Sequence, residues 1–326
     1  MIIIKNPHTD PYFNLASEEY LIDNMTDDLF MLWRNEASVI IGRSQNAYAE
    51  LDREFIAAHS IKAVRRLTGG GAVFHDPGNV NYTFITTDGS ASLDFKRFCT
   101  PVIEALRTLG INAELSGRND ITADGRKISG TAQTLRNGRV LHHGTLLFDS
   151  DLTALAGALR PDPAKLQSKG ISSVKSRVTN LKPLIGRDMD TLEFLTYIEE
   201  YVASHSDITE VRALNDRDIA AIEKLRDEKY STWEWNWGES KQFERSEKRR
   251  FPNCGSVECS VTSEKGFIKA ISIRGDFFGV RDIAFVEQRL IGVRYERAAV
   301  ESVLCEVGLG DFIAGAEARE IASLII

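Results

Sequence analysis

Two dipeptides near the middle of the chain constrain its fold more than any other feature of the sequence. Asp124-Gly125 and Asn137-Gly138 are the residue pairs that two-residue β-hairpin turns favour, because both turn positions need positive φ. Residues 121–148 are therefore expected to fold as antiparallel strands. Lys127 then lies just past the first turn.

Hydrophobic spacing elsewhere predicts a mixture of helices and strands. Helices are expected over 14–25, with Asn14 as the capping residue, and over 52–59, 93–109, 190–205 and 216–229. Strands are expected over 29–33, 38–41, 62–68, 72–74, 80–85, 256–263 and 267–273.

Two local patterns need separate interpretation. Pro101 fits either the first turn of its helix or a kink within it. Three tryptophans, Trp233, Trp235 and Trp237, alternate as they would in a strand, so they are expected to face one side and to pack in a core or between domains.

The charged run 239–250 is expected to link two domains, because the pattern of strands and helices restarts after it. A chain of 326 residues is long enough for one large domain and one smaller domain. The predicted domains are therefore 1–245 and 246–326.

Composition and charge exclude several classes of protein. The net charge of −7 argues against a dedicated nucleic-acid binder, although the basic strip 241–250 could contact an anionic partner. The start, Met1 to Lys5, does not resemble a signal peptide, and no apolar run reaches membrane-spanning length, so a cytoplasmic protein is expected. The four cysteines show no CxxC spacing, which predicts reduced thiols and no zinc site.

The segment 65–76, RRLTGGGAVFHD, contains the first candidate site. Three successive glycines let the main chain approach a ligand closely, and their amides can converge on phosphate oxygens. The two preceding arginines carry forked donors that suit phosphate or carboxylate. The spacing matches neither a Walker A loop nor a dinucleotide fingerprint. Alone, it also fits a tight turn beside two surface arginines.

A second candidate site surrounds Lys127. Its small neighbours Ser129 and Gly130 leave space beside the ammonium group, and such space suits an anion. An exposed edge-strand lysine that prevents aggregation is the alternative. Asn119 and Asp120 fit an ordinary turn, or a contact to a base edge and to a metal ion respectively.

His142 and His143 lie on alternating faces of the predicted strand, so one imidazole points inward. A hydrogen-bonded structural histidine is favoured over a catalytic one.

Together these segments resemble the lipoate–protein ligase A family in its two-domain bacterial form. The segments that carry the resemblance are PYFNLASEEY, LWRNEASVIIGRSQN, RRLTGGGAVFHDPGN, SGRNDI, RKISGTAQ, HHGTLL, KGISSVKSRVTN and STWEWNWG. The resemblance implies an α+β fold: mixed β-sheets with flanking helices form a biotin/lipoate-protein ligase catalytic domain, similar to class II synthetases. It also implies a small, mobile α+β C-terminal domain.

The same resemblance implies an activity. Lipoate would be activated with ATP and Mg²⁺ to lipoyl-AMP, and the lipoyl group would pass to a lysine of a lipoyl domain. The implied acceptors are the acyltransferase subunits of 2-oxoacid dehydrogenases and the glycine-cleavage H protein. A monomer is expected, with no nucleic-acid or membrane partner.

The resemblance assigns roles to particular residues. Lys127 would hold the lipoate carboxylate and then the phosphate of lipoyl-AMP. The other positions that match the family's nucleotide site are Arg66, Gly71, Ala72, Val73 and Phe74. Nearby second-tier candidates are Arg65, Gly70, Asn79 and Asn119, and Asp120 is the candidate magnesium ligand. An apolar tunnel for the lipoyl tail would have Trp33, Val39, Ile41 and Val73 as wall residues, although each also fits a core.

Three alternatives stay open at this stage. A lipoyl or octanoyl transferase of the same fold would need an activated cysteine, and the large domain offers only Cys99, in a predicted helix. A biotin ligase has a different glycine-rich motif. A non-catalytic relative would bind lipoate or lipoyl-AMP without turnover.

Overall fold

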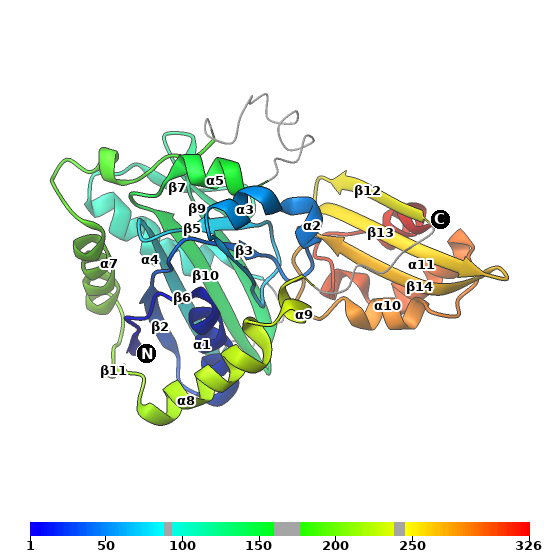
Figure 1. Cartoon of the computed structure of the whole chain (residues 1–326), viewed down its shortest axis with the longest axis horizontal. Coiled ribbons are helices and arrows are strands. Elements are labelled where there is room, and N and C mark those ends of the chain that lie inside the picture. The colour runs from blue at the N-terminus through cyan, green and yellow to red at the C-terminus, as the bar shows by residue number, and fades with distance from the viewer. Residues whose placement is uncertain (88–92, 160–176, 238–244) are drawn as a thin grey trace.

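The computed structural model describes residues 1–87, 93–159, 177–237 and 245–326. The chain forms a large α+β body and a smaller C-terminal α+β body that lies beside one end of it (Figure 1). This arrangement confirms the predicted fold class.

An eight-stranded mixed sheet forms the centre of the large body. Its strand order is β11-β1-β2-β6-β10-β9-β8-β7. The first three strands of this order pair in parallel, and all pairs from β2 to β7 are antiparallel. In chain order the strands are β1 (Ile2–Lys5), β2 (Leu29–Trp33), β6 (Asn79–Thr87), β7 (Ala113–Ser116), β8 (Asp120–Ala123), β9 (Arg126–Arg136), β10 (Arg139–Leu147) and β11 (Glu210–Ala213).

Helices cover both faces of this sheet, so its strands are buried on both sides. On one face α4 (Phe95–Thr108) and α7 (Thr191–Ser204) share a core with Phe30 and Tyr82. On the other face α1 (Pro11–Asn24) and α8 (Asp216–Leu225) pack around Met31 and Trp33. One π-helical turn, Arg226–Tyr230, extends α8.

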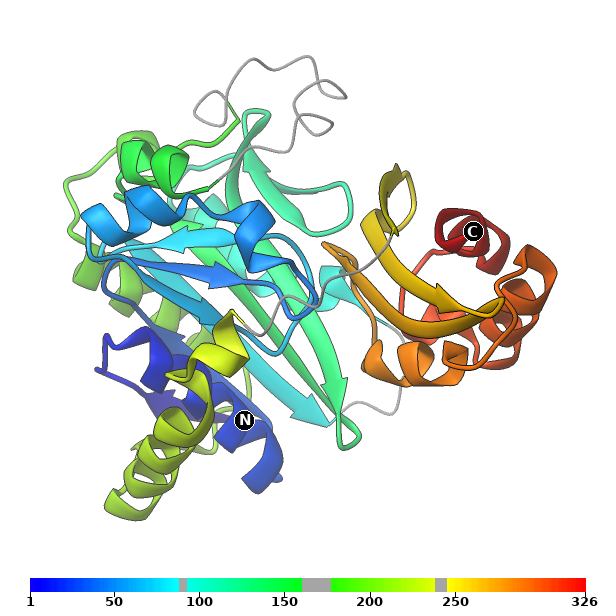
Figure 2. The same cartoon turned by 45° about the vertical axis from the view of Figure 1, so that its right-hand side comes forward.

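A smaller sheet, β4-β3-β5, packs on the α1 side of the large sheet (Figure 2). The strand β3 (Ser38–Ile41) is parallel to β4 (Lys62–Arg65) and antiparallel to β5 (Val73–His75). The outer face of this sheet is covered by α2 (Ala47–Glu50), α3 (Arg53–Ala58) and α5 (Leu152–Ala158).

The C-terminal body has an antiparallel sheet and a hydrophobic core of its own. Its strands are β12 (Arg245–Phe251), β13 (Gly255–Glu264) and β14 (Phe267–Gly275). The helices α10 (Ala284–Leu290), α11 (Arg297–Glu306) and α12 (Ala318–Ile325) pack against this sheet.

The predicted hairpins are confirmed. Asp124 and Gly125 have φ of 49° and 75°, and Asn137 and Gly138 have φ of 53° and 73°. Positive φ at both central positions is the requirement of the tight turn that matches strand twist. Lys127 is the second residue of β9, just past the first turn.

Several local predictions were wrong. Asn14 does not cap α1, because Asp10 does so by accepting a hydrogen bond from the Tyr12 amide. Asn14 is instead buried, and its amide donates to the carbonyl oxygens of His8 and Arg34. Of the two alternatives given for Pro101, the structure shows the position within the helix, because Pro101 lies well inside α4 rather than in its first turn.

The tryptophans do not alternate in a strand. Trp233 and Trp235 lie in a short helix, α9 (Trp233–Asn236), and Trp237 follows as its C-cap. The hydroxyl of Thr232 accepts a hydrogen bond from the Trp235 amide and so starts the helical turn. Trp235 faces inward and donates its Nε1–H to the Arg65 carbonyl at 2.8 Å, whereas Trp233 is 49% exposed.

The expected linker is wrong over residues 245–250, which belong to a strand. Residues 239–244 lie outside the described part of the chain, but Arg245–Phe251 form the edge strand β12. A highly charged sequence is compatible with an edge strand, because charge on an edge discourages pairing with other chains.

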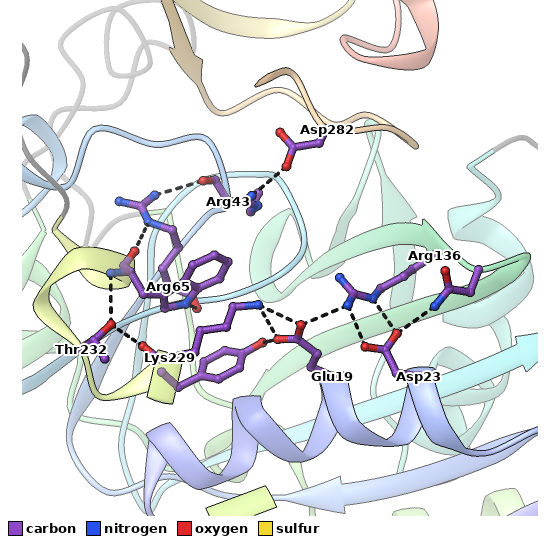
Figure 3. A network of polar contacts seen from close by, with 11 residues as sticks. Glu19, Asp23, Arg43, Arg65, Arg136, Lys229, Thr232 and Asp282 are labelled. Atoms are coloured by element: carbon purple, nitrogen blue, oxygen red, sulfur yellow. Dashed lines mark hydrogen bonds and ion pairs between the residues drawn. The ribbon is translucent and has the colours of Figure 1, made fainter. Parts of the chain in front are cut away.

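A buried network centred on Glu19 joins three parts of the large body (Figure 3). Its carboxylate accepts hydrogen bonds from Lys229 Nζ at 2.6 and 2.8 Å, from the Tyr230 hydroxyl at 2.7 Å and from Arg136 Nη2 at 3.1 Å. The Asp23 carboxylate also accepts hydrogen bonds from Arg136, from Nε at 2.6 Å and from Nη2 at 2.7 Å. Helix α1, the β9–β10 hairpin and the π-helical turn are thereby tied together.

We expect Glu19→Gln to lower the free energy of unfolding by about 3 kcal/mol, because it leaves the partly buried Lys229 ammonium without its counter-charge. The matched control is Asp23→Asn, whose more exposed ion pair should contribute less than about 1 kcal/mol. Urea unfolding followed by tryptophan fluorescence measures both. Equal losses in the two variants would contradict the central role of Glu19.

Candidate active site

A cavity of about 750 Å³ lies where the two bodies meet. The wall contains residues of the glycine loop (69–71), the large sheet, the β7–β8 turn and the C-terminal body. Part of this wall is apolar and core-facing, with Leu15, Trp33, Ile40 and Val73. Another part is charged, and Lys127 belongs to it.

Arg66 holds the glycine loop from behind. Its buried guanidinium donates to the Thr68 hydroxyl at 2.9 Å, and to the carbonyl oxygens of Ile40 at 3.0 Å, Gly69 at 2.6 Å and Gly71 at 2.8 Å. Burial lowers the pKa of Arg66 to about 10, and the carboxylate of Glu18 opposes this shift. The side chain therefore stays charged at neutral pH and supplies a fixed positive charge to the cavity wall.

Two of the three glycines allow the C-terminal body to approach. A Cβ at Gly69 would lie 2.3 Å from the Phe277 carbonyl oxygen, and one at Gly70 would lie 2.9 Å from the Phe278 ring. Gly70 has φ of 89°, and its N–H donates to the Phe277 carbonyl at 3.3 Å. These glycines therefore serve domain packing in this structure, whereas residues 70–74 still line the cavity.

Lys127 and Asp120 form an ion pair in the cavity wall, with 2.8 Å between Nζ and Oδ1. The ammonium lies over Gly130, where a Cβ would come within 2.9 Å of Nζ. The main chain of Lys127 also bonds to the carbonyl of Arg177 and the amide of Thr179, each at 2.9 Å. The edge-strand alternative for this lysine is therefore wrong, and the predicted open space beside it is confirmed.

Asn119 lines the cavity next to this pair, but its side chain already has a structural role. Its Nδ2 donates to the Thr131 carbonyl at 2.6 Å, and the Thr131 amide and hydroxyl donate back to the Asn119 carbonyl at 2.9 and 3.0 Å. These bonds fix the β7–β8 turn against β9.

Two second-tier candidates lie outside the cavity. Arg65 is buried, and burial lowers its pKa to about 9, with further contributions from neighbouring arginines. Its guanidinium donates to five backbone carbonyls, those of Gly42, Arg43, Gln45, Trp235 and Asn236. No donor set directed at a ligand remains, so Arg65 supports the fold.

Asn79 is the other candidate outside the cavity. It is fully buried on β6 and donates to Asn81 Oδ1 at 2.8 Å. Asn81 lines the cavity instead. The period of two along a strand places both side chains on one face, but the sequence did not distinguish them.

The apolar wall corrects two of the predicted tunnel residues. Trp33 and Val73 line the cavity, but Val39 and Ile41 belong to the outer core under α3 and α5. Side chains alternate along β3, so Ile40 faces the cavity. The correct strand was predicted with the wrong face.

A chain of buried hydrogen bonds runs behind this wall. Trp33 Nε1–H donates to the Thr83 hydroxyl at 2.8 Å, and Thr83 donates to Glu18 at 2.6 Å. His143 lies 2.9 Å from Glu18 through Nδ1 and 2.7 Å from the Thr68 hydroxyl through Nε2. His143 is therefore hydrogen-bonded through both ring nitrogens, as predicted, and it also lines the cavity.

His142 points to the opposite face of the sheet. It is fully buried and stacks on Phe98 with 5.0 Å between ring centroids. Burial, and then the neighbouring His143, hold the pKa of His142 well below its usual value, so the ring is neutral.

Cys99 is unsuited to thioester chemistry. It is fully buried in α4, and burial raises the pKa of its thiol to about 11. Its sulfur lies 3.9 Å from Thr131 Oγ1 and from His142 Nε2, outside the cavity wall. A nucleophilic thiolate needs a lowered pKa and access to substrate, so this residue does not support the transferase alternative.

Among the described residues, no three histidine, cysteine, aspartate or glutamate side chains gather as a metal site. The helices in the same part of the chain are too short or too polar to cross a membrane.

Comparisons with known proteins agree over the whole chain. The family described as the lipoyl protein ligase A/B catalytic domain matches residues 10–203, and the family described as the bacterial lipoate protein ligase C-terminus matches residues 240–325. Lipoate-protein ligase LplJ of Bacillus subtilis (strain 168) is 40% identical over 331 residues, and the match covers 100% of each chain.

Two solved structures are similar in fold and sequence. The bi-partite lipoate protein ligase of Thermoplasma acidophilum, studied with its E2 lipoyl domain, has a TM-score of 0.63 and 28% identity, and the match covers 75% of this chain and 98% of that chain. A lipoate-protein ligase A bound with ATP has a TM-score of 0.61 and 28% identity, with 73% and 98% covered. The chain therefore belongs to the lipoate–protein ligase family, with a lipoyl protein ligase A/B catalytic domain followed by the bacterial C-terminal domain.

Proposed function

We propose that this protein is an ATP-dependent ligase that converts lipoate to lipoyl-AMP and transfers the lipoyl group to a lysine of a lipoyl domain. The observation that carries the proposal is the position of Lys127, in a cavity that combines an apolar wall with a charged wall. The relatives named as lipoate–protein ligases support the same activity.

The charge of the cavity suits a polyanionic substrate such as ATP. Its described lining residues include five cations, which are Arg66, Arg118, Lys127, Arg177 and Arg250. They include three carboxylates, which are Glu50, Asp120 and Asp276. The excess of positive charge favours a ligand with several negative charges.

The first step joins two anions. A lipoate carboxylate oxygen attacks the α-phosphorus of ATP, the bond from that phosphorus to the bridging oxygen breaks, and pyrophosphate leaves with the electron pair. Lys127 is suited to this step because its ammonium can move from Asp120 to the carboxylate and the α-phosphate, where it offsets their repulsion. Arg66 and residues 71–74 would form the nucleotide wall beside it.

The second step uses the mixed anhydride. The neutral amine of the acceptor lysine attacks the acyl carbon of lipoyl-AMP, the bond from that carbon to the phosphate oxygen breaks, and AMP leaves. The amide formed loses the proton of the attacking amine. Lys127, still beside the phosphate, would stabilise the charge on the departing AMP.

The lipoyl tail would lie against the apolar wall formed by Trp33, Ile40 and Val73. Such a wall binds an alkyl chain by removing apolar surface from water. The buried His143 and Glu18 hold the polar groups behind it in fixed positions.

The residues also fit a magnesium ion held together with ATP. Mg²⁺ is commonly bound by one or two carboxylates plus substrate phosphates rather than by a complete protein cage. Asp120, partly exposed in the cavity wall beside Lys127, would supply such a carboxylate. The ion would neutralise phosphate charge.

The proposed acceptors are the lipoyl domains of 2-oxoacid dehydrogenase acyltransferase subunits and the glycine-cleavage H protein. The pairing of the archaeal relative with its E2 lipoyl domain supports this choice of acceptor. We further propose that the protein is a cytoplasmic monomer, with a catalytic domain over 1–245 and an accessory domain over 246–326 that can move relative to it.

Lys127→Met is expected to lower lipoate-dependent exchange of pyrophosphate into ATP by about 100-fold or more, because it removes the cation that faces both reacting anions. The matched control is the exposed neighbour Arg126, whose change to Met should leave the exchange within about twofold of wild type. Equal exchange by wild type and Lys127→Met would contradict the assignment.

Cys99→Ala is expected to retain lipoylation of an acceptor domain within about twofold of wild type, because the thiol is buried outside the cavity and has a raised pKa. Acceptor mass measured over time tests this. Complete loss of transfer by a folded Cys99→Ala variant would favour the thioester route.

Removal of divalent cations with EDTA is expected to abolish exchange of pyrophosphate into ATP, and added Mg²⁺ should restore it. Asp120→Asn should raise the Mg²⁺ concentration needed for half-maximal exchange. Full exchange in EDTA would rule out the proposed ion.

A further inference from the structure

Two arginines from different bodies lie in the same charged part of the cavity wall. Arg118 belongs to the β7–β8 turn of the large body, and Arg250 is the penultimate residue of β12 in the C-terminal body. Neither has a role in the two steps described above. Both lie close enough to interact electrostatically, because Arg250 contributes to lowering the pKa of Arg118, after burial.

Arg118 is held by the C-terminal body. Its guanidinium lies 4.3 Å from the centre of the Phe278 ring, and its Nη1 donates to the Cys254 carbonyl at 3.2 Å. The carboxylates of Asp276 and Asp120 oppose the lowering of its pKa. Since Asp120 pairs with Lys127, the Arg118 guanidinium lies in the same electrostatic cluster as the reacting groups.

Arg250 forms an ion pair with Asp276, whose position is fixed by a hydrogen bond of its own. Its Nη1 lies 3.6 Å from Asp276 Oδ2 and donates to the Ser256 hydroxyl at 3.3 Å. Asp276 is buried, and its Oδ1 accepts a hydrogen bond from the Ser256 amide at 2.6 Å. A Cβ at Gly255 would lie 2.5 Å from that oxygen, so glycine is needed there.

The cavity therefore has cations in addition to the one that the α-phosphate needs. Arg66 is already bonded to four acceptors behind the glycine loop. Arg118 and Arg250 line the same cavity from different bodies, and Asp276 offsets part of the positive charge of both. Two like charges on one cavity wall favour binding of a further anion there. A triphosphate has two phosphates beyond the α-phosphate, and forked guanidinium donors suit them.

We propose that Arg118 and Arg250 bind the β- and γ-phosphates of ATP, one arginine from each body. This assignment rests on the proposed ligase function and adds two binding residues to it. When the bond between the α-phosphorus and the bridging oxygen breaks, the electron pair passes to pyrophosphate. The two guanidinium groups stabilise the charge that develops there.

The two half-reactions should then differ in their need for Arg250. Lipoyl-AMP has no β- or γ-phosphate, so the transfer step gives these arginines no ligand. Loss of either arginine should weaken adenylation and spare transfer from preformed lipoyl-AMP.

The test uses the full chain with Arg250→Gln and, as a matched control, Arg249→Gln. Both changes remove one positive charge from the same strand, but Arg249 bonds to Ser323 and does not line the cavity. Lipoate-dependent exchange of pyrophosphate into ATP reports the first step, and acceptor lipoylation from synthetic lipoyl-AMP reports the second.

For Arg250→Gln we expect kcat/KM for ATP in the exchange reaction to fall by roughly 10- to 100-fold, with a higher KM for pyrophosphate. Transfer from lipoyl-AMP should stay within about twofold of wild type, and Arg249→Gln should match wild type in both assays. Arg118→Lys, which keeps a charge but loses the fork, should lie between wild type and Arg118→Gln.

Two results would overturn this assignment. Exchange by Arg250→Gln equal to that of Arg249→Gln would remove Arg250 from the phosphate site. An equal fall in both half-reactions would show a general packing role instead, and thermal unfolding of each variant identifies misfolding. Wild-type protein without lipoate-dependent exchange would overturn the ligase function itself, which is a different outcome from either.

Discussion

The buried guanidinium of Arg66 is the interaction on which the candidate site depends most. It joins the carbonyl oxygens of Gly69 and Gly71 to that of Ile40, so one side chain fixes the glycine loop relative to the small sheet. A glycine-rich loop loses much conformational freedom on ordering. Arg66 offsets that loss and places its own charge behind the loop. Its bond to Thr68 also reaches the His143 and Glu18 chain behind the apolar wall.

The second constraint is the packing of two bodies around one cavity. Gly69 and Gly70 accept the backbone of Phe277 and Phe278 at distances that a Cβ would prevent. The same short loop therefore lines the cavity on one side and contacts the C-terminal body on the other. Arg43 adds to the contact between the two bodies (Figure 3). Its guanidinium donates to the Asp282 carboxylate at 2.7 Å and lies 4.7 Å from the centre of the Trp235 ring. The shape of the cavity wall and the position of the C-terminal body are thus physically connected.

The features that the sequence predicted well are local ones. The hairpin turns follow from the need for positive φ at Asn137 and Gly138, and Lys127 could be placed because a turn fixes the residues next to it. The errors arise where contacts between residues far apart in the sequence determine the role or orientation of a side chain. Arg65 has the residue type of a phosphate ligand, but five carbonyls from two distant segments accept hydrogen bonds from it. The direction in which β3 faces, and the meeting of Arg118 with Arg250, depend on packing between elements that no local pattern encodes.

The most direct test of the ligase function is the mass of an isolated lipoyl domain after incubation with this protein and free lipoate, with and without ATP. The predicted result is one added lipoyl group on a single lysine, formed only with ATP and Mg²⁺. Modification of the domain without any nucleotide, or none with ATP, Mg²⁺ and free lipoate all present, would contradict the account.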